Sequence, residues 1–97
     1  MPDFKLTLYN LDDGTSPTAL AQSILEEYGT DFDLSEGAFE AKAIGNEVEV
    51  ICFDVGPGDA TDLQKRMYEK YGDEDDKMFI RISERIGPGW FAYEPEE

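Results

Sequence analysis

The side chains that most often perform catalysis or bind metal are scarce in this sequence. It contains no His, the commonest general base near neutral pH, and a single cysteine, Cys52. One cysteine excludes an internal disulfide and a zinc site built from several thiolates. The residue types therefore favour a protein that binds without catalysing, with no catalytic residue, no metal and no other cofactor.

Carboxylates are the one reactive group present in excess. Asp and Glu number 23 in 97 residues, against 8 Lys and Arg, which gives a net charge of −15. Close carboxylate pairs then arise by chance, and none has the spacing of a nucleophile with its base. Asp31, Asp33 and Ser35 fit the first three side-chain positions of a calcium loop. However, Gly37 comes one residue late and Lys42 replaces the bidentate Glu, so we interpret this segment as a solvated loop.

Two other features of the sequence have structural explanations. The segment Gly56-Pro57-Gly58-Asp59 precedes a predicted helix, as a phosphate-binding loop would. It lacks the Lys and the Ser or Thr of such loops, and Asp59 would repel a phosphate. Cys52 falls at an inward strand position, where cysteines behave as small buried hydrophobic residues. We interpret the first feature as a turn and the second as part of the core.

Hydrophobic periodicity predicts the elements that position these side chains. Ser16 is a suitable N-cap, Pro17 a suitable first helical residue, and Gly29 occupies the place of a C-terminal cap. Asp59 is the expected cap of a second helix, and Gly45-Asn46 is typical of a two-residue hairpin turn. The predicted strands are 4–9, 38–44, 47–54, 78–83 and 90–93, and the predicted helices are 17–28 and 60–71.

The order of these elements repeats along the chain. A shift of 43 residues places Ile24 and Gly29 on Met67 and Gly72. Two consecutive β-α-β units predict an α+β fold, the ferredoxin-like two-layer sandwich β-α-β-β-α-β, with an antiparallel-rich sheet and an added C-terminal strand. A chain of this length forms a single domain, 1–97, which ends in an acidic tail at 94–97.

Alternation within the strands assigns each side chain to one face of the predicted sheet. The two helices cover one face, and the inward residues are Leu6, Leu8, Val48, Val50, Ile80 and Ile82. The open face carries Lys5, Thr7, Tyr9, Glu49, Ile51, Phe53, Phe79 and Arg81. That face is more apolar than a solvated sheet requires. We expect either that the last strand and the tail cross it, or that it binds a second copy, as a homodimer, or another partner.

The negative charge excludes several classes of partner. Phosphate binding needs clustered Lys and Arg, so we expect neither direct binding of nucleic acid nor binding to anionic membranes. No apolar run approaches the ~20 residues that cross a bilayer. The N-terminal residues lack the basic and apolar regions of a signal peptide, and a single cysteine fits a reducing compartment. We therefore expect a cytoplasmic protein.

The acidic residues themselves form the remaining candidate site. They concentrate in the segments that follow the two predicted helices, which we expect to emerge at the same end of the sheet. The predicted partner-binding residues are Asp31, Asp33, Glu36, Asp73, Glu74, Asp75 and Asp76, with Glu26, Glu27 and Glu69 nearby. Repulsion among these carboxylates destabilises the fold. We therefore expect that a function is the reason for such a surface. Fixed carboxylates can imitate the phosphates of duplex DNA, which carry one charge per ~1.7 Å.

Acidic runs give the chain a family resemblance. These runs are Asp31-Phe32-Asp33, Asp73-Glu74-Asp75-Asp76 and Glu94-Pro95-Glu96-Glu97. In size, charge and compactness the whole chain resembles the small acidic phage proteins that block host defence, in particular the DNA-mimic type of anti-CRISPR protein. The resemblance implies a stoichiometric inhibitor in the host cytoplasm. It would occupy the DNA-binding surface of a basic nucleic-acid-binding partner, above all a CRISPR surveillance complex.

Two other functions fit parts of the sequence. The open sheet face predicts a protein-interaction or dimerisation module, which Phe53→Asp would disrupt and changes in the acidic loops would not. An excess of Asp and Glu is also typical of halophilic proteins, although Lys, with 5 of the 8 basic residues, is not depleted relative to Arg. An enzyme or metalloprotein is the least favoured interpretation.

Overall fold

A computed structural model of the protein describes residues 3–11, 14–31, 39–71 and 78–93. The strands are β1 Phe4–Tyr9, β2 Phe39–Ile44, β3 Glu47–Cys52, β4 Phe79–Ile86 and β5 Gly89–Ala92, and the helices are α1 Pro17–Asp31 and α2 Pro57–Tyr71. Each predicted element is present. The differences lie at the ends of the elements.

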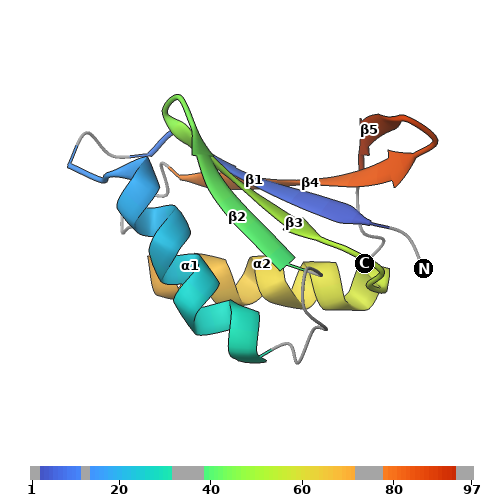
Figure 1. Ribbon diagram of the computed structural model, residues 1–97, viewed down its shortest axis with the longest axis horizontal. Coiled ribbons are helices and arrows are strands. Elements are labelled where there is room, and N and C mark those ends of the chain that lie inside the picture. Colours follow the sequence, from blue (N-terminus) through green and yellow to red (C-terminus); the bar gives the residue numbers. More distant parts are fainter. Residues whose placement is uncertain (1–2, 12–13, 32–38, 72–77, 94–97) are drawn as a thin grey trace.

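The strands form one open sheet in the order β2-β3-β1-β4-β5, and each neighbouring pair is antiparallel. Both helices cover the same face of this sheet, as Figure 1 shows. The order is that of a ferredoxin-like two-layer sandwich with one strand added beside β4. The predicted α+β fold is therefore confirmed.

The core lies between the sheet and the two helices. Phe4, Leu6 and Leu8 of β1 are fully buried, and they lie opposite Cys52, Val50 and Val48 of β3. The helices contribute Leu20, Ala21, Ile24, Tyr28, Ala60, Leu63 and Met67 to the same cluster. All six residues predicted to point inward are buried. Burial of each large aliphatic side chain contributes about 1.5–3 kcal/mol, so this layer supplies most of the stability.

Helix α1 begins as the sequence predicts and ends later. The Ser16 hydroxyl accepts a hydrogen bond from the Ala19 backbone N–H at 3.3 Å, which confirms the N-cap. The helix then continues through Gly29 to Asp31. A glycine inside a helix costs only about 1 kcal/mol, and the burial of Tyr28 in the preceding position offsets such a cost. Leu25 lies next to the fully buried Ile24 in the helix but is itself 39% exposed.

Helix α2 begins earlier than the sequence predicts. The Gly56 carbonyl accepts hydrogen bonds from the N–H groups of Asp59 and Ala60, at 3.1 and 3.3 Å, so the helix starts at Pro57. Proline is favoured at a first helical position because its missing N–H would have no partner there. Asp59 therefore lies in the first turn, where its charge suits the helix dipole, and is not the N-cap.

Two tight turns shape the sheet. Gly45 has φ +60° at the first position of the β2–β3 turn, which is typical of a type II′ hairpin and confirms the predicted Gly45-Asn46 turn. Gly87, with φ +61°, joins β4 to β5. In Figure 1 this second hairpin rises from the sheet on the side away from the helices. After β5 the chain returns to the core. There the rings of Tyr93 and Phe4 pack edge-to-face with their centroids 5.3 Å apart.

Candidate functional site

The net charge of the protein is unevenly distributed along the chain. We call residues 12–13, 32–38, 72–77 and 94–97 the acidic segments; they hold 11 acids and one base, a net charge of −10. The described residues, which we call the framework, hold 12 acids and 7 bases, a net charge of −5. Two thirds of the net charge therefore belongs to short segments outside the elements of the sandwich.

Within the framework, basic side chains pair with acids. Four such pairs are Lys5–Glu49 at 3.3 Å, Arg66–Asp62 at 3.1 Å, Arg85–Asp3 at 3.5 Å, and Lys70–Glu27. The Asp62–Arg66 pair spans one helical turn, as its spacing predicts. Each such surface pair contributes at most about 1 kcal/mol, so their main effect is to neutralise the framework locally.

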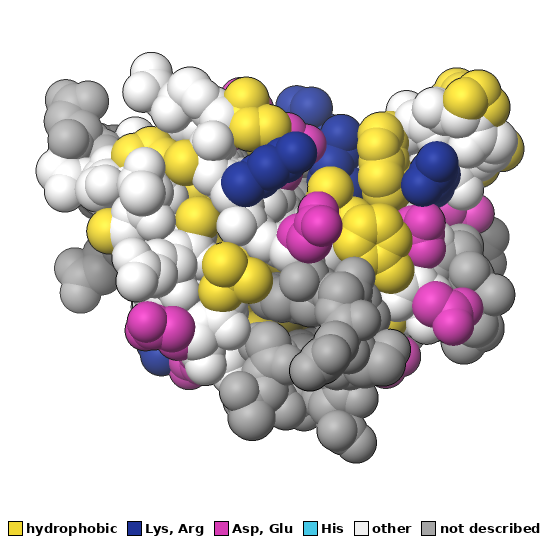
Figure 2. Space-filling model, viewed as in Figure 1, with side chains coloured by type: hydrophobic (Ala, Val, Ile, Leu, Met, Phe, Trp, Pro, Cys, Tyr) yellow, Lys and Arg dark blue, Asp and Glu magenta, His cyan; other side chains and the backbone are white. Residues whose placement is uncertain are grey.

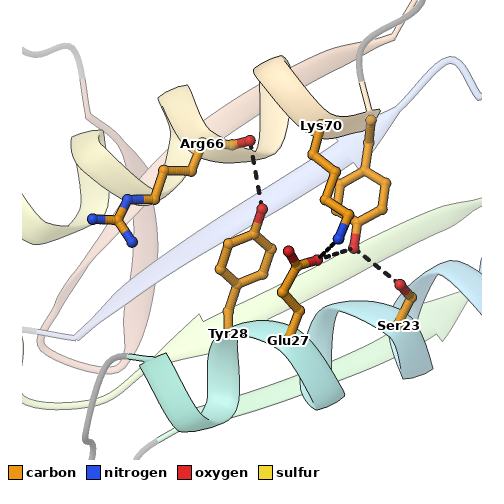
Figure 3. A network of polar contacts seen from close by, with 6 residues as sticks. Ser23, Glu27, Tyr28, Arg66 and Lys70 are labelled. Carbon is orange, nitrogen blue, oxygen red and sulfur yellow. Dashed lines mark hydrogen bonds and ion pairs between the residues drawn. The ribbon is translucent and has the colours of Figure 1, made fainter.

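Glu27, predicted to bind a partner, takes part in a network between the two helices (Figure 3). Lys70 of α2 donates to its carboxylate, and the Tyr71 hydroxyl donates to the same oxygen at 3.1 Å. Since the Tyr71 proton is used there, the Ser23 hydroxyl 3.0 Å away is the donor to the Tyr71 oxygen. Tyr28 extends the contact by donating to the Arg66 carbonyl at 3.5 Å.

The network shifts the pKa values of its members. The hydrogen bond from Lys70 lowers the pKa of Glu27, and the same bond raises the pKa of Lys70. Burial raises the pKa of Tyr71. These shifts favour the charged pair and the neutral phenol near pH 7. The Glu27 carboxylate thus serves the helix interface.

The other predicted site residues fall into three groups. Glu26 on α1 and Glu69 on α2 are exposed, as a binding role requires. Asp31 ends α1. The remaining residues, Asp33, Glu36 and Asp73 to Asp76, lie outside the described residues.

The expectation that both helices lead to the same end of the sheet is wrong. After α1 the chain re-enters the sheet at Phe39, opposite Cys52, which pairs with Phe4. After α2 it re-enters at Phe79, opposite Tyr9, at the other end of β1. Because β1 and β3 are antiparallel, the two β-α-β units run in opposite directions, and so do their helices. Ser23 contacts Tyr71, whereas Tyr28, later in α1, contacts Arg66, earlier in α2. This order of contacts is that of antiparallel helices.

The topology groups the acidic segments differently. At the Tyr9 end of β1 the chain leaves toward 12–13, and it returns from 72–77 into the neighbouring strand at Phe79. The exposed Glu47 follows the hairpin turn at the same end. The sequence analysis did not include residues 12–13 among the candidate site residues. The signal was available, since connections after β1 and before β4 must meet when those strands are antiparallel neighbours.

The opposite end of β1, at Phe4, receives the other two acidic segments. The chain enters β2 from 32–38 beside Cys52 and Phe4. It leaves β5 through Tyr93, whose ring lies against Phe4, toward the tail at 94–97. The molecule therefore has an acidic connection at each end of the sheet, where we had expected a single acidic end.

The open sheet face has a different character. Lys5 Nζ lies 5.0 Å from the Trp90 ring centroid, and the Arg81 guanidinium lies 4.8 Å from that of Tyr9. The Tyr9 and Phe79 rings stack with centroids 5.7 Å apart, and Phe79 is 46% exposed. Figure 2 shows Lys and Arg side chains among hydrophobic ones over the sheet, in the upper part of the view. Cation–π pairs of this kind satisfy both partners while leaving aromatic edges accessible.

The sequence has a single thiol, that of Cys52. Cys52 is buried, and burial raises the pKa of its thiol to about 12, so it is inert at neutral pH. Within the described ranges, no group of three or more His, Cys, Asp or Glu side chains is placed to hold a metal ion. Neither described helix has the length and apolar character needed to cross a membrane.

Comparison of the chain with protein-family models, with curated proteins and with solved structures gave no match. Inferences about function therefore rest on the charge and geometry of this chain. The division of charge between framework and acidic segments is the strongest functional signal among them.

Proposed function

We propose that this protein is a non-enzymatic DNA mimic that inhibits a nucleic-acid-binding host system, most readily a CRISPR surveillance complex, by occupying its DNA-binding surface. Its charge density supports this function. A net charge of −15 over the 36 Å longest extent of the Cα trace averages one charge per 2.4 Å. Duplex DNA carries one per ~1.7 Å, so a groove built for DNA would meet a comparable density of negative charge.

The observation that carries the proposal is the position of the acids. A protein that is acidic only for solubility, or adapted to high salt, would gain from acids on every exposed surface. Helix α2 instead has three acids and three bases, and the framework as a whole carries only −5 of the net charge of −15. The excess lies in the acidic segments at both ends of the sheet. The negative charge is thus concentrated in a few short runs of the sequence, in which several carboxylates together could replace several phosphates.

The mechanism is competition. The field of the acidic segments would speed encounter with a basic groove, and salt would weaken the complex. Inside the groove, Lys and Arg side chains would exchange phosphate oxygens for carboxylate oxygens. Single rim carboxylates would contribute little, since exposed ion pairs are worth at most about 1 kcal/mol each. Binding would therefore depend on several acids together.

The test is inhibition of target-DNA binding by purified CRISPR surveillance complexes, measured by gel shift. The key variant is Asp73→Asn/Glu74→Gln/Asp75→Asn/Asp76→Asn, which removes four negative charges from one acidic segment. The matched control, Asp62→Lys/Glu84→Lys, changes the net charge by the same amount within the framework. We expect the first variant to lose inhibition and the control to keep it. Equal inhibition by both folded variants would exclude the 72–77 segment from the site.

A second candidate is a protein-interaction module that uses the open sheet face, and the exposure of Phe79 beside Tyr9 and Arg81 favours it. Phe79→Asp distinguishes the two functions. This change would abolish binding through the sheet face and leave DNA mimicry intact.

A further inference from the structure

Strand β2 leaves one edge of the sheet available for pairing. In the described part of the chain its only strand neighbour is β3. The type II′ turn closes with a hydrogen bond between Ile44 and Glu47, so the backbone groups of Ile44 face β3. These groups alternate along a strand, so those of Phe39, Ala41 and Ala43 face away from β3. An edge of this kind is a template for pairing with another strand.

The side chains of β2 favour one pairing partner. Glu40 and Lys42 are exposed and, by their register with Ile51 and Glu49, belong to the open face of the sheet. A two-fold axis through Ala41 would place Glu40 of each copy opposite Lys42 of the other. Sliding the strands by two residues in either direction would instead oppose like charges, Glu40 to Glu40 or Lys42 to Lys42. Opposite charges stabilise directly opposed cross-strand pairs, and like charges destabilise them.

The helix-covered side of the same edge supplies an apolar contact. An open groove beside β2 is lined by Leu25 of α1 together with Glu40, Ala41 and Lys42. Leu25 is 39% exposed there, although most of its helical neighbours on the sheet side are buried. The two-fold axis through Ala41 would bring the Leu25 side chains of two copies to the same side of the joined sheet. Their exposed surfaces would then cover each other.

We propose that two copies of this chain pair antiparallel through β2, with the two-fold axis at Ala41, to form one continuous ten-stranded sheet. The interface is isologous, because each copy contributes the same edge. It consists of backbone pairing by Phe39, Ala41 and Ala43, reciprocal Glu40–Lys42 pairs on the open face, and Leu25 on the helix side. This inference is independent of the proposed function, since the acidic segments take no part in it.

The register gives a charge-swap test. Glu40→Lys alone puts lysines opposite each other, and Lys42→Glu alone puts glutamates opposite each other. Each would weaken dimerisation about tenfold or more. The double swap restores opposite charges, so it should dimerise as the wild type does. Equal amounts of the two single variants should form a heterodimer, because each offers the charges that the other lacks.

The measurement is sedimentation equilibrium at physiological or higher ionic strength, where a Debye length of about 8 Å or less screens the repulsion between two highly charged copies. Native mass spectrometry of the mixed single variants identifies the heterodimer. Ala41→Pro adds a backbone test, because it removes an N–H that faces the second copy and none that faces β3. We expect it to shift the equilibrium toward monomer with unchanged circular dichroism.

Three results would overturn the proposal. The first is a wild-type protein that stays monomeric at the highest concentration reached. The second is a dimer that both single swaps leave unchanged. The third is a dimer that Phe79→Asp dissociates and the single swaps do not, which would place the interface on the open sheet face.

Discussion

The framework and the acidic segments differ widely in their density of charge. The framework has a net charge of −5 over 76 residues, and the rest of the chain has −10 over 21 residues. The framework buries an apolar core in which Thr7 and Ser83 are the only buried polar residues among those described. The comparison teaches that the buried core and most of the net charge lie in different parts of the chain. Core packing and net charge can therefore be altered by separate substitutions.

The largest effect is expected in the framework. Leu63 is fully buried between α2 and the sheet, so Leu63→Ala would leave a cavity and lower the free energy of unfolding by about 2–5 kcal/mol. Urea denaturation followed by circular dichroism measures this loss. The comparison predicts that inhibition by the folded fraction does not change. A folded Leu63→Ala protein without inhibition would show that the division is false.

A second prediction concerns Cys52, whose pKa of about 12 compares with an ordinary value of 9.0. At pH 8 the folded protein should hold about 1,000-fold less thiolate than an exposed cysteine, and its reaction with a thiol reagent should slow accordingly. Unfolding in guanidinium chloride should restore the ordinary rate. Rapid modification of the native protein would show that the sheet opens at β3.

The acidic segments should have the opposite effect on stability. Neutralising Asp73 to Asp76 removes self-repulsion, so it should raise the free energy of unfolding by about 0.5–2 kcal/mol. Added salt should stabilise the wild type more than this variant, as thermal unfolding would show. A wild type that loses its helical signal in low salt and regains it only in molar KCl would support halophilic adaptation instead.

The smallest effect is expected at the network between the helices. Tyr71→Phe removes the hydrogen bonds to Ser23 and Glu27 and should cost less than about 1 kcal/mol. The matched change Tyr68→Phe instead removes the hydroxyl that accepts from the Ile80 N–H. Equal unfolding free energies for wild type and Tyr71→Phe would mean that the network adds nothing to packing.

The same network gives a pH dependence with a defined sign. The pKa of Glu27 is lowered from its ordinary 4.5, so its contribution is present above that value and is lost as the pH falls through the folded pKa. The pKa values of Lys70 and Tyr71 are raised from 10.5 and 10.0, so their contribution is lost as the pH rises through the folded values. Glu27→Gln should remove the acid limb and reduce the alkaline limb of the stability profile, where the burial of Tyr71 still acts.

Sequence reasoning predicted the parts of the fold that local patterns determine. The alternation of β1 assigned Leu6 and Leu8 to the core, and the position of Cys52 assigned it there as well. Helix ends were predicted less well. Gly29 lies inside α1 and Pro57 begins α2, because packing and carbonyl pairing decide those ends and intrinsic preference does not. Leu25 has helical spacing suited to the core yet lies at the exposed edge of β2.

The candidate site was predicted in composition more than in position. The acids that follow α1 and α2 were identified, but their placement at the same end was wrong because it ignored the direction of each β-α-β unit. The pairing of Tyr9 with Phe79 shows that the connections through 12–13 and 72–77 reach the same end of the sheet. From the sequence alone Glu27 could not be distinguished from a solvent-exposed acid, because only the tertiary fold brings Lys70 next to it.

The central claim is that the acidic segments occupy a surface built for DNA. The most direct test is capture of bacterial lysate proteins on the tagged protein at low salt, followed by elution with duplex DNA. The account predicts that DNA releases nucleic-acid-binding proteins, above all CRISPR subunits, and that the Asp73 to Asp76 variant does not capture them. Partners held equally by both proteins and unaffected by DNA or salt would contradict it.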